Sequence, residues 1–170
     1  LGHIGKLDVK EPFAALFTQG MVTHETYSRI DESRGVPVFF GPEEVDRTSE
    51  GATLLADGAP VEVGRVIKMS KSKKNVVDPD AIIARHGADA VRWFMLSDSP
   101  PERDLPWSDA GIEGCARFAQ RLWRLFQAYD AGAAGEDKAL DRKTHQTIAA
   151  VAADIEALGF NKAVARIYEL

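Results

Sequence analysis

The sequence predicts an α+β fold, in which a small β-rich insertion is followed by a mainly α-helical region that begins a helical bundle. Two observations support this prediction. In residues 23–67, short apolar runs are separated by Gly, Pro, Asp and Ser, which is typical of short strands joined by turns. Beyond residue 76, apolar residues recur at the spacing of helices that bury one face. The chain has 170 residues, enough for one good core or two small ones.

Composition limits the class of protein. The hydrophobic content of 45% and the charged content of 28% are ordinary for a soluble globular protein. No apolar run approaches the length of a membrane span and no signal-peptide pattern is present, so we expect a cytoplasmic protein without a membrane partner. The single cysteine, Cys115, fits a reducing compartment. The four histidines lack metal-ligand spacing, so we expect no bound metal.

The first residues predict a short helix ahead of the β-rich part. Pro12 lies at an early position that helices permit, and Gly20 is an end signal. The apolar stripe of this helix consists of Phe13, Leu16 and Phe17. Met21-Val22 then predicts entry into a strand.

Residues 23–67 carry two strand signals and two turn signals. The runs Val36–Phe40 and Val61–Val63 are the predicted strands. Asp57-Gly58 predicts a tight turn, and the residues after Pro42 predict one helical turn. No catalytic chemistry is visible in this part of the sequence.

Helix signals resume at Asp78-Pro79, with Asp78 as the expected N-cap and Gly87 as the end. A second helix is predicted to begin at Asp89 and to break before Pro100-Pro101. A long helix from Ser108 is predicted to bury Ile112, Cys115, Ala116, Ala119, Leu122, Trp123 and Phe126. After a loop at 132–135, a helix over 137–158 is predicted to bury Leu140, Ile148, Val151, Ile155 and Leu158, and Asn161 is the expected cap of the next helix.

The most distinctive stretch is Lys68-Met69-Ser70-Lys71-Ser72. From Arg65 to Lys74 there are five basic residues and no acidic one, in a chain of formal net charge −5, so the remainder carries about −10. Ammonium groups on long stems can follow a moving phosphate, and Ser hydroxyls can bond its oxygens or the backbone of the loop. A helix start follows directly, and helix N-terminal amides favour anions. On composition alone, a solvated loop, a nuclear-localisation signal or a kinase-target patch stays open.

The order of these residues resembles the second nucleotide-binding motif of class I aminoacyl-tRNA synthetases. The continuation Asn75–Pro79 and the run Gly87–Arg92 resemble the branch of that class that serves Leu, Ile, Val and Met. The segment Ser97–Trp123 is similar to the leucyl-tRNA synthetases in particular. The position of residues 23–67, just ahead of the basic stretch, resembles that of the leucine-specific insertion in the bacterial enzymes.

The resemblance implies four regions: residues 1–22 end a catalytic Rossmann-type domain, 23–67 form the leucine-specific-type insertion, 68–107 carry the basic loop and linking helices, and 108–170 begin an anticodon-binding-type helical bundle. His3-Ile4-Gly5-Lys6 is similar to the first nucleotide-binding motif, His-x-Gly-His, but Lys6 replaces the second His, so His3 is expected to be a surface residue. Because the chain opens on Leu1 and closes within a helical pattern, we expect it to be a fragment of a larger multidomain enzyme.

The implied reaction joins leucine to ATP as leucyl-adenylate and then moves leucine to the 3′ end of tRNA(Leu). The implied ligands are ATP with Mg²⁺, leucine and the tRNA, in a monomeric parent enzyme that does not bind DNA. Lys71 is the predicted catalytic residue, and Lys68, Met69, Ser70, Lys71 and Ser72 are the predicted ATP-binding residues. The fragment alone is expected to be inactive, because the His-x-Gly-His motif, the leucine pocket and the editing domain are missing from its sequence.

Three points stay open. The row formed by Arg117, Arg121 and Arg124 is either a solvated helix face or a clamp for the tRNA backbone. Residues 23–67 are either a structural spacer or a tRNA-contacting part. The parent could also charge isoleucine or valine, and the chain could instead be a non-catalytic RNA-binding module, although its pI near 5.4 argues against strong general RNA affinity.

Overall fold

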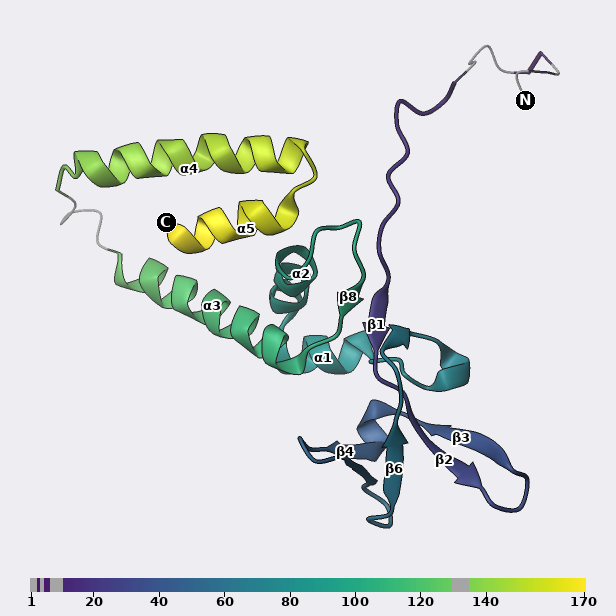
Figure 1. The fold of residues 1–170 in the computed structure, drawn as a ribbon. Coiled ribbons are helices and arrows are strands. Elements are labelled where there is room, and N and C mark those ends of the chain that lie inside the picture. The colour runs from purple at the N-terminus through teal and green to yellow at the C-terminus, as the bar shows by residue number, and fades with distance from the viewer. Residues whose placement is uncertain (1–2, 4, 7–10, 130–134) are drawn as a thin grey trace.

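A computed structural model of the chain describes residues 3, 5–6, 11–129 and 135–170 (Figure 1). Within these residues the chain forms two sheets and five α-helices, which confirms the predicted α+β fold. The strands gather in the first part of the chain and the helices in the second. In the view of Figure 1, the helices α2 to α5 lie to the left of the three-stranded sheet, and the five-stranded sheet lies below it.

The three-stranded sheet joins parts of the chain that are far apart in sequence. Its central strand is β1 (Val22–His24). Strand β7 (Ile67–Lys68) pairs antiparallel with β1, and β8 (Leu105–Pro106) pairs parallel with it. The strand predicted at Met21-Val22 is therefore present, and it brings the start of the basic stretch next to the first part of the chain.

The five-stranded sheet lies inside residues 23–67, which we call the β-rich segment. Its strands are β2 (Tyr27–Asp31), β3 (Val36–Phe40), β4 (Val45–Arg47), β5 (Ala52–Leu54) and β6 (Pro60–Val63), in the spatial order β3-β2-β6-β5-β4 with antiparallel neighbours throughout. Its core consists of Tyr27, Val45, Ala52, Leu54 and Val61.

The local signals of the β-rich segment are confirmed. Both predicted strands are present, and the helical turn after Pro42 is the short 3₁₀-helix η2 (Pro42–Glu44). The tight turn at Asp57-Gly58 joins β5 to β6, with Gly58 at a φ of 69°, where glycine is favoured. The Asp57 carboxylate fixes this turn by accepting a hydrogen bond from the Ala59 amide at 2.9 Å.

Three helices surround the second core. They are α1 (Pro79–His86), α2 (Ala88–Ser97) and α3 (Asp109–Ala128). Asp78 caps α1 through the Asp80 amide, as predicted, and Ser108 caps α3 through the Gly111 amide at 3.1 Å. Helix α2 begins one residue before the predicted start. The buried residues of this core are Ala90, Phe94, Leu105, Ile112 and Cys115.

The last two helices are α4 (Lys138–Glu156) and α5 (Phe160–Glu169), which pack against each other, while α5 also contacts α2. The loop predicted at 132–135 lies outside the described residues except for Gly135. The prediction that Asn161 caps the last helix is wrong. Leu158 takes a left-handed φ of 57° and turns the chain, so the Gly159 carbonyl already accepts the amides of Lys162 and Ala163.

The helix predicted before Gly20 is wrong. Residues 11–20 have no helical hydrogen bonds, and the stripe residue Leu16 is 90% exposed. Figure 1 shows this segment running outward as an extended chain. A short amphipathic segment gains helical stability mainly by packing its apolar face, and this stripe has no surface of the described chain to pack on.

Two predicted apolar faces are buried only in part. On α3, Ile112 and Cys115 are buried, whereas Leu122, Trp123 and Phe126 are exposed. On α4, the exposed residues include Leu140, Ile148 and Ile155, and the buried residue is Thr147 instead; Leu158 is also exposed and lies in the turn after α4. The reason is that α4 meets α5 along the face of Thr147, and Asp154 on that side binds Arg166.

Candidate functional site

The basic stretch forms a compact loop, which we call the basic loop (residues 68–74). Lys68 is the last residue of β7, where it pairs with Thr23 of β1, and the Met69 amide donates to the Val22 carbonyl at 3.2 Å. The chain then makes a single 3₁₀ turn, η3 (Lys71–Lys73). Lys74 closes the turn at a left-handed φ of 51°. The sheet therefore fixes where the loop begins.

The predicted ATP-binding residues, Lys68 to Ser72, run from the end of β7 into this turn. Lys68, Lys71 and Ser72 are exposed, and Met69 and Ser70 are half-buried. The Oγ atoms of Ser70 and Ser72 are 3.3 Å apart and share a hydrogen bond. The loop thus presents two ammonium groups to solvent above a turn that its serine hydroxyls help to shape.

The other two lysines of the loop are held by the β-rich segment. Lys74 Nζ lies 3.3 Å from Glu44 Oε2, and Lys73 Nζ lies 4.1 Å from the centre of the Phe39 ring. Within the described part of the chain, neither Lys68 nor Lys71 forms an ion pair. The basic residues therefore divide into a pair that binds the β-rich segment and a pair that is open to a ligand.

Glu44 suits its role as the partner of Lys74. Its carboxylate accepts a hydrogen bond from the Gly41 amide at 2.6 Å, and that bond, with a smaller contribution from Lys74, holds the pKa of Glu44 below its ordinary value. The carboxylate therefore stays ionised at neutral pH. Neither Glu44 nor Phe39 could be predicted as a partner of the loop, because nothing near either residue in the sequence marks it as a neighbour of the loop.

Helix α1 starts shortly after the loop, but its N-terminus is already occupied. The Asp78 carboxylate accepts a hydrogen bond from the Asp80 amide at 3.0 Å, and Asp80 adds a second negative charge in the first turn. An anion competes poorly with these carboxylates. Phosphate binding at this site would therefore depend on Lys68 and Lys71.

The three arginines of α3 also come together. Arg117, Arg121 and Arg124 line one hollow of about 360 Å³, together with Gly114, Phe118 and Tyr168. Arg117 lies 3.8 Å from Glu113, Arg121 lies over the Phe118 ring at 5.2 Å, and Arg124 donates to the Gln120 carbonyl at 3.3 Å. These contacts are weak and largely exposed, so the guanidinium groups could still bind an anionic chain.

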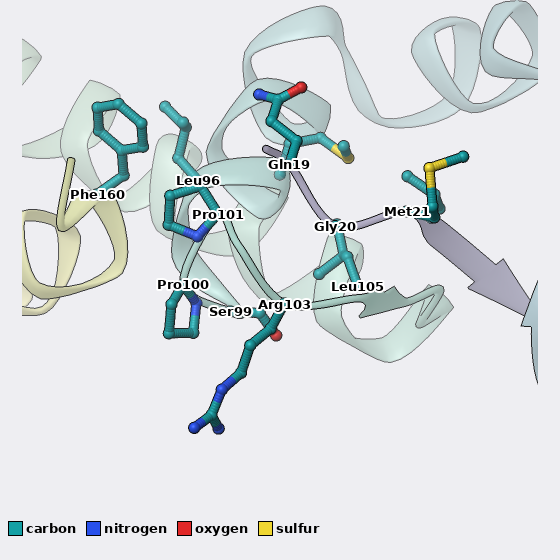
Figure 2. A pocket seen from close by; sticks show the side chains of 12 residues that line it. Gln19, Gly20, Met21, Leu96, Ser99, Pro100, Pro101, Arg103, Leu105 and Phe160 are labelled. Carbon is teal, nitrogen blue, oxygen red and sulfur yellow. The ribbon is translucent and has the colours of Figure 1, made fainter. Parts of the chain in front are cut away.

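A further pocket, of about 190 Å³, lies where the first described segment meets the helical region (Figure 2). Figure 2 shows apolar side chains such as Leu96, Leu105 and Phe160 around it. The Gly20 amide donates to the Pro101 carbonyl at 2.9 Å, and the Met21 amide donates to Asp104 Oδ1 at 2.8 Å. Arg103 is the only charged residue in its lining. We therefore assign the pocket a structural role, because these bonds fix the approach to β1.

His3 is exposed, as predicted for a surface residue. Over the residues that the structure describes, no three His, Cys, Asp or Glu side chains gather closely enough to hold a metal ion. No helix in that part of the chain has the length and apolar character needed to cross a membrane.

Comparisons with known proteins point to one family. Residues 60–108 match the family model of class I tRNA synthetases (I, L, M and V). The chain is 78% identical to the leucine–tRNA ligase of Novosphingobium aromaticivorans, 72% identical to that of Sphingopyxis alaskensis and 62% identical to that of Rhizorhabdus wittichii. Each alignment covers 100% of this chain but only 19–20% of the relative, so the chain spans about a fifth of the length of these proteins.

The fold agrees with that of a solved relative. The structure matches the LeuRS of Agrobacterium radiobacter, solved as a ternary complex described as LeuRS-tRNA-LeuAMS, with a TM-score of 0.64. The match covers 98% of this chain and 18% of that chain at 24% identity, which shows a shared fold. The high identities over the whole chain and the class I match together show that the chain belongs to the leucyl-tRNA synthetase family.

Proposed function

We propose that this chain is the part of a leucine–tRNA ligase that presents the phosphate-binding loop. The parent enzyme would join leucine to ATP as leucyl-adenylate, release pyrophosphate, and transfer leucine to tRNA(Leu). One observation carries the proposal. Lys68 and Lys71 stand open to solvent in a loop whose other lysines, Lys73 and Lys74, are held by the β-rich segment.

The chemistry requires a positive charge at the leaving group. The leucine carboxylate attacks the α-phosphorus in line, the bond to the bridging oxygen breaks, and negative charge grows on the departing pyrophosphate. An ammonium group placed there stabilises the transition state more than the ground state. We assign this role to Lys71 at the apex of the loop, with Lys68 binding the phosphates from the end of β7.

The remaining loop residues would support these lysines. Ser70 and Ser72 would shape the turn through the contact between their hydroxyls and could bind phosphate oxygens. Met69, half-buried and bonded through its amide to Val22, would anchor the start of the loop by packing. Glu44 and Phe39 would keep Lys73 and Lys74 away from the ligand.

ATP is expected to enter the parent enzyme with Mg²⁺. Mg²⁺ is usually held through substrate phosphates with one or two carboxylates, and the described residues contain no close group of three His, Cys, Asp or Glu side chains that could hold the ion without ATP. We therefore assign no step of the reaction to the ion.

The arginine hollow is the part of the chain best suited to bind tRNA. Arg117, Arg121 and Arg124 present guanidinium groups around one depression, and such groups bind backbone phosphates with a strong dependence on salt. The remaining expectations are a monomeric, cytoplasmic parent and no catalysis by these 170 residues alone, because the sequence lacks an intact His-x-Gly-His motif.

The test is leucine-dependent exchange of pyrophosphate into ATP by the full-length enzyme. We expect Lys71→Ala to lower the exchange rate by about a hundredfold, which corresponds to roughly 3 kcal/mol of lost transition-state stabilisation. Lys138→Ala, at the exposed start of α4, is the matched control and should leave the rate unchanged.

The same assay with isoleucine, valine and methionine tests the substrate. Exchange that depends on one of these amino acids and not on leucine would overturn the leucine assignment while keeping the chemistry. An unchanged rate in Lys71→Ala would overturn the proposed role of the loop.

A further inference from the structure

Asn75 lies directly after the basic loop and is fully buried, with 0% of its surface exposed. A buried amide side chain must find its hydrogen-bond partners within the protein, because an unpaired polar group there costs free energy. All the partners of Asn75 are backbone groups, and they lie on two stretches of the chain, His24 and residues 67–70.

The amide of Asn75 has both its acceptor and its donors engaged. Its Oδ1 atom accepts a hydrogen bond from the Ser70 amide at 2.9 Å. Its Nδ2 atom donates to the carbonyls of His24 at 3.2 Å, Ile67 at 3.3 Å and Lys68 at 3.4 Å. Because Nδ2 carries two hydrogens, these three carbonyls share them.

These partners surround the base of the basic loop. His24 ends β1, Ile67 and Lys68 form β7, and Ser70 is the residue just before η3. One side chain therefore ties the entry of the loop to the residues just before its turn, and ties both to the central strand of the sheet. Lys71 is exposed and is the first residue of the turn, so its mean position depends on how this base is fixed.

We propose that Asn75 is a positioning residue for adenylate formation, which holds the base of the basic loop so that Lys68 and Lys71 meet the phosphates of ATP. This inference rests on the proposed function of the loop. Asn75 does not touch the substrate in this scheme. It acts through the lysines, since a small displacement of a charged group from its productive position is enough to slow a reaction strongly.

The sharpest variant is Asn75→Asp in the full-length enzyme. Aspartate has the same shape, but its ionised side chain has only acceptors and would face the three carbonyls without a donor. We expect kcat/KM for ATP in leucine-dependent exchange to fall by about 10- to 100-fold. The KM for leucine should stay unchanged, and so should the transfer of leucine from preformed leucyl-adenylate to tRNA, because neither needs the loop to be placed against ATP.

Asn161→Asp is the matched control. It makes the same chemical change in the first turn of α5, far from the loop in the fold, and should leave all three measurements unchanged.

A second measurement does not depend on catalysis. Hydrogen–deuterium exchange of the Ser70 amide should be faster in Asn75→Asp than in the wild type, because repulsion between the carboxylate and the three carbonyls moves the acceptor away from this amide.

The outcomes separate this inference from the proposed function. If Lys71→Ala abolishes exchange but Asn75→Asp matches the wild type, the inference about Asn75 is wrong and the function of the loop stands. If Lys71→Ala has no effect, the proposed function fails, whatever Asn75→Asp does. Should Asn75→Asp not fold, Asn75→Ser replaces it, and a wild-type kcat/KM for ATP in that variant would overturn the inference.

Discussion

The β-rich segment and the long helices α3 and α4 use apolar residues in different ways. In the β-rich segment, Leu54 is 6% exposed and its neighbours in the core come from four strands of one sheet. On α3, Leu125 is 69% exposed, and Trp123 and Phe126 are exposed beside it. The apolar pattern is clear in both regions. The difference shows that such a pattern defines the face that can be buried, while burial itself depends on what lies opposite.

The two regions differ in how they meet their partners. Strands β2, β4, β5 and β6 close one core within a short stretch of chain, so the five core side chains bury one another without help from the rest of the chain. Helix α3 packs on α2 only through its first part, and α4 packs on α5. The second half of α3, and the side of α4 that does not face α5, therefore keep their apolar side chains in contact with water.

The largest expected difference is between two leucines, one in each region. Leu54→Ala should destabilise the chain by about 2–5 kcal/mol, because it removes buried methyl groups and leaves a cavity. Leu125→Ala should change the stability by less than about 0.5 kcal/mol, because the side chain already lies in water. Urea unfolding followed by circular dichroism measures both variants. Equal losses of stability in the two variants would show that Leu125 is packed, and the two regions would then not differ in how they use apolar residues.

A pair of glycines tests the backbone in the two regions. In Gly64→Ala the new methyl group would overlap the hydroxyl of the buried Thr26, so we expect a loss of about 1–3 kcal/mol. In Gly114→Ala, within α3, the methyl group would meet only Arg117 at 3.8 Å, and the better helix propensity of alanine should add about 0.5–1 kcal/mol. The same unfolding experiment should therefore give opposite signs. A destabilised Gly114→Ala would mean that α3 is more closely packed there than the structure shows.

The smallest effect is expected at an exposed ion pair. Glu25 lies 3.0 Å from Arg47 at the edge of the β-rich segment, and this hydrogen bond holds the pKa of Glu25 below its ordinary value of 4.5. When folding lowers the pKa of a carboxyl group, the group adds stability at pH values above its pKa in the unfolded chain. This stability is lost as the pH falls through the pKa of the group in the folded chain. The wild type should therefore be slightly more stable than Glu25→Gln at about pH 7, and the difference should disappear below pH 4.5. A difference that stays constant with pH would exclude this pair as its source.

Sequence analysis predicted the features that are local in the chain. Asp78 and Asp57-Gly58 act within a few residues of themselves, so the cap and the turn that they form were predicted correctly, as was the start of α3 near Ser108. The lysines and serines of the basic loop could be chosen for the same reason, since they are adjacent in sequence and lie together in the structure.

Apart from the cap of α5, the missed features depend on contacts between distant residues. Glu44 reaches Lys74 across 30 positions of the chain, and Asn75 reaches His24 across 51. Neither contact leaves a pattern around the residues concerned. The helix predicted over residues 11–20 failed for a related reason, because its stripe of Phe13, Leu16 and Phe17 has no opposing surface in the described chain.

The pairing of β1 with β7 has a consequence for how the β-rich segment could be exchanged. His24 and Ile67 face each other in an antiparallel register, so the chain leaves the three-stranded sheet and returns to it at the same point. A tight two-residue turn between these strands would close an ordinary hairpin. We therefore expect that the residues between His24 and Ile67 can be lengthened, shortened or replaced while the pairing of β1 with β7 is kept. The same exchange would remove Glu44 and Phe39, so a substitute must bring its own partners for Lys73 and Lys74.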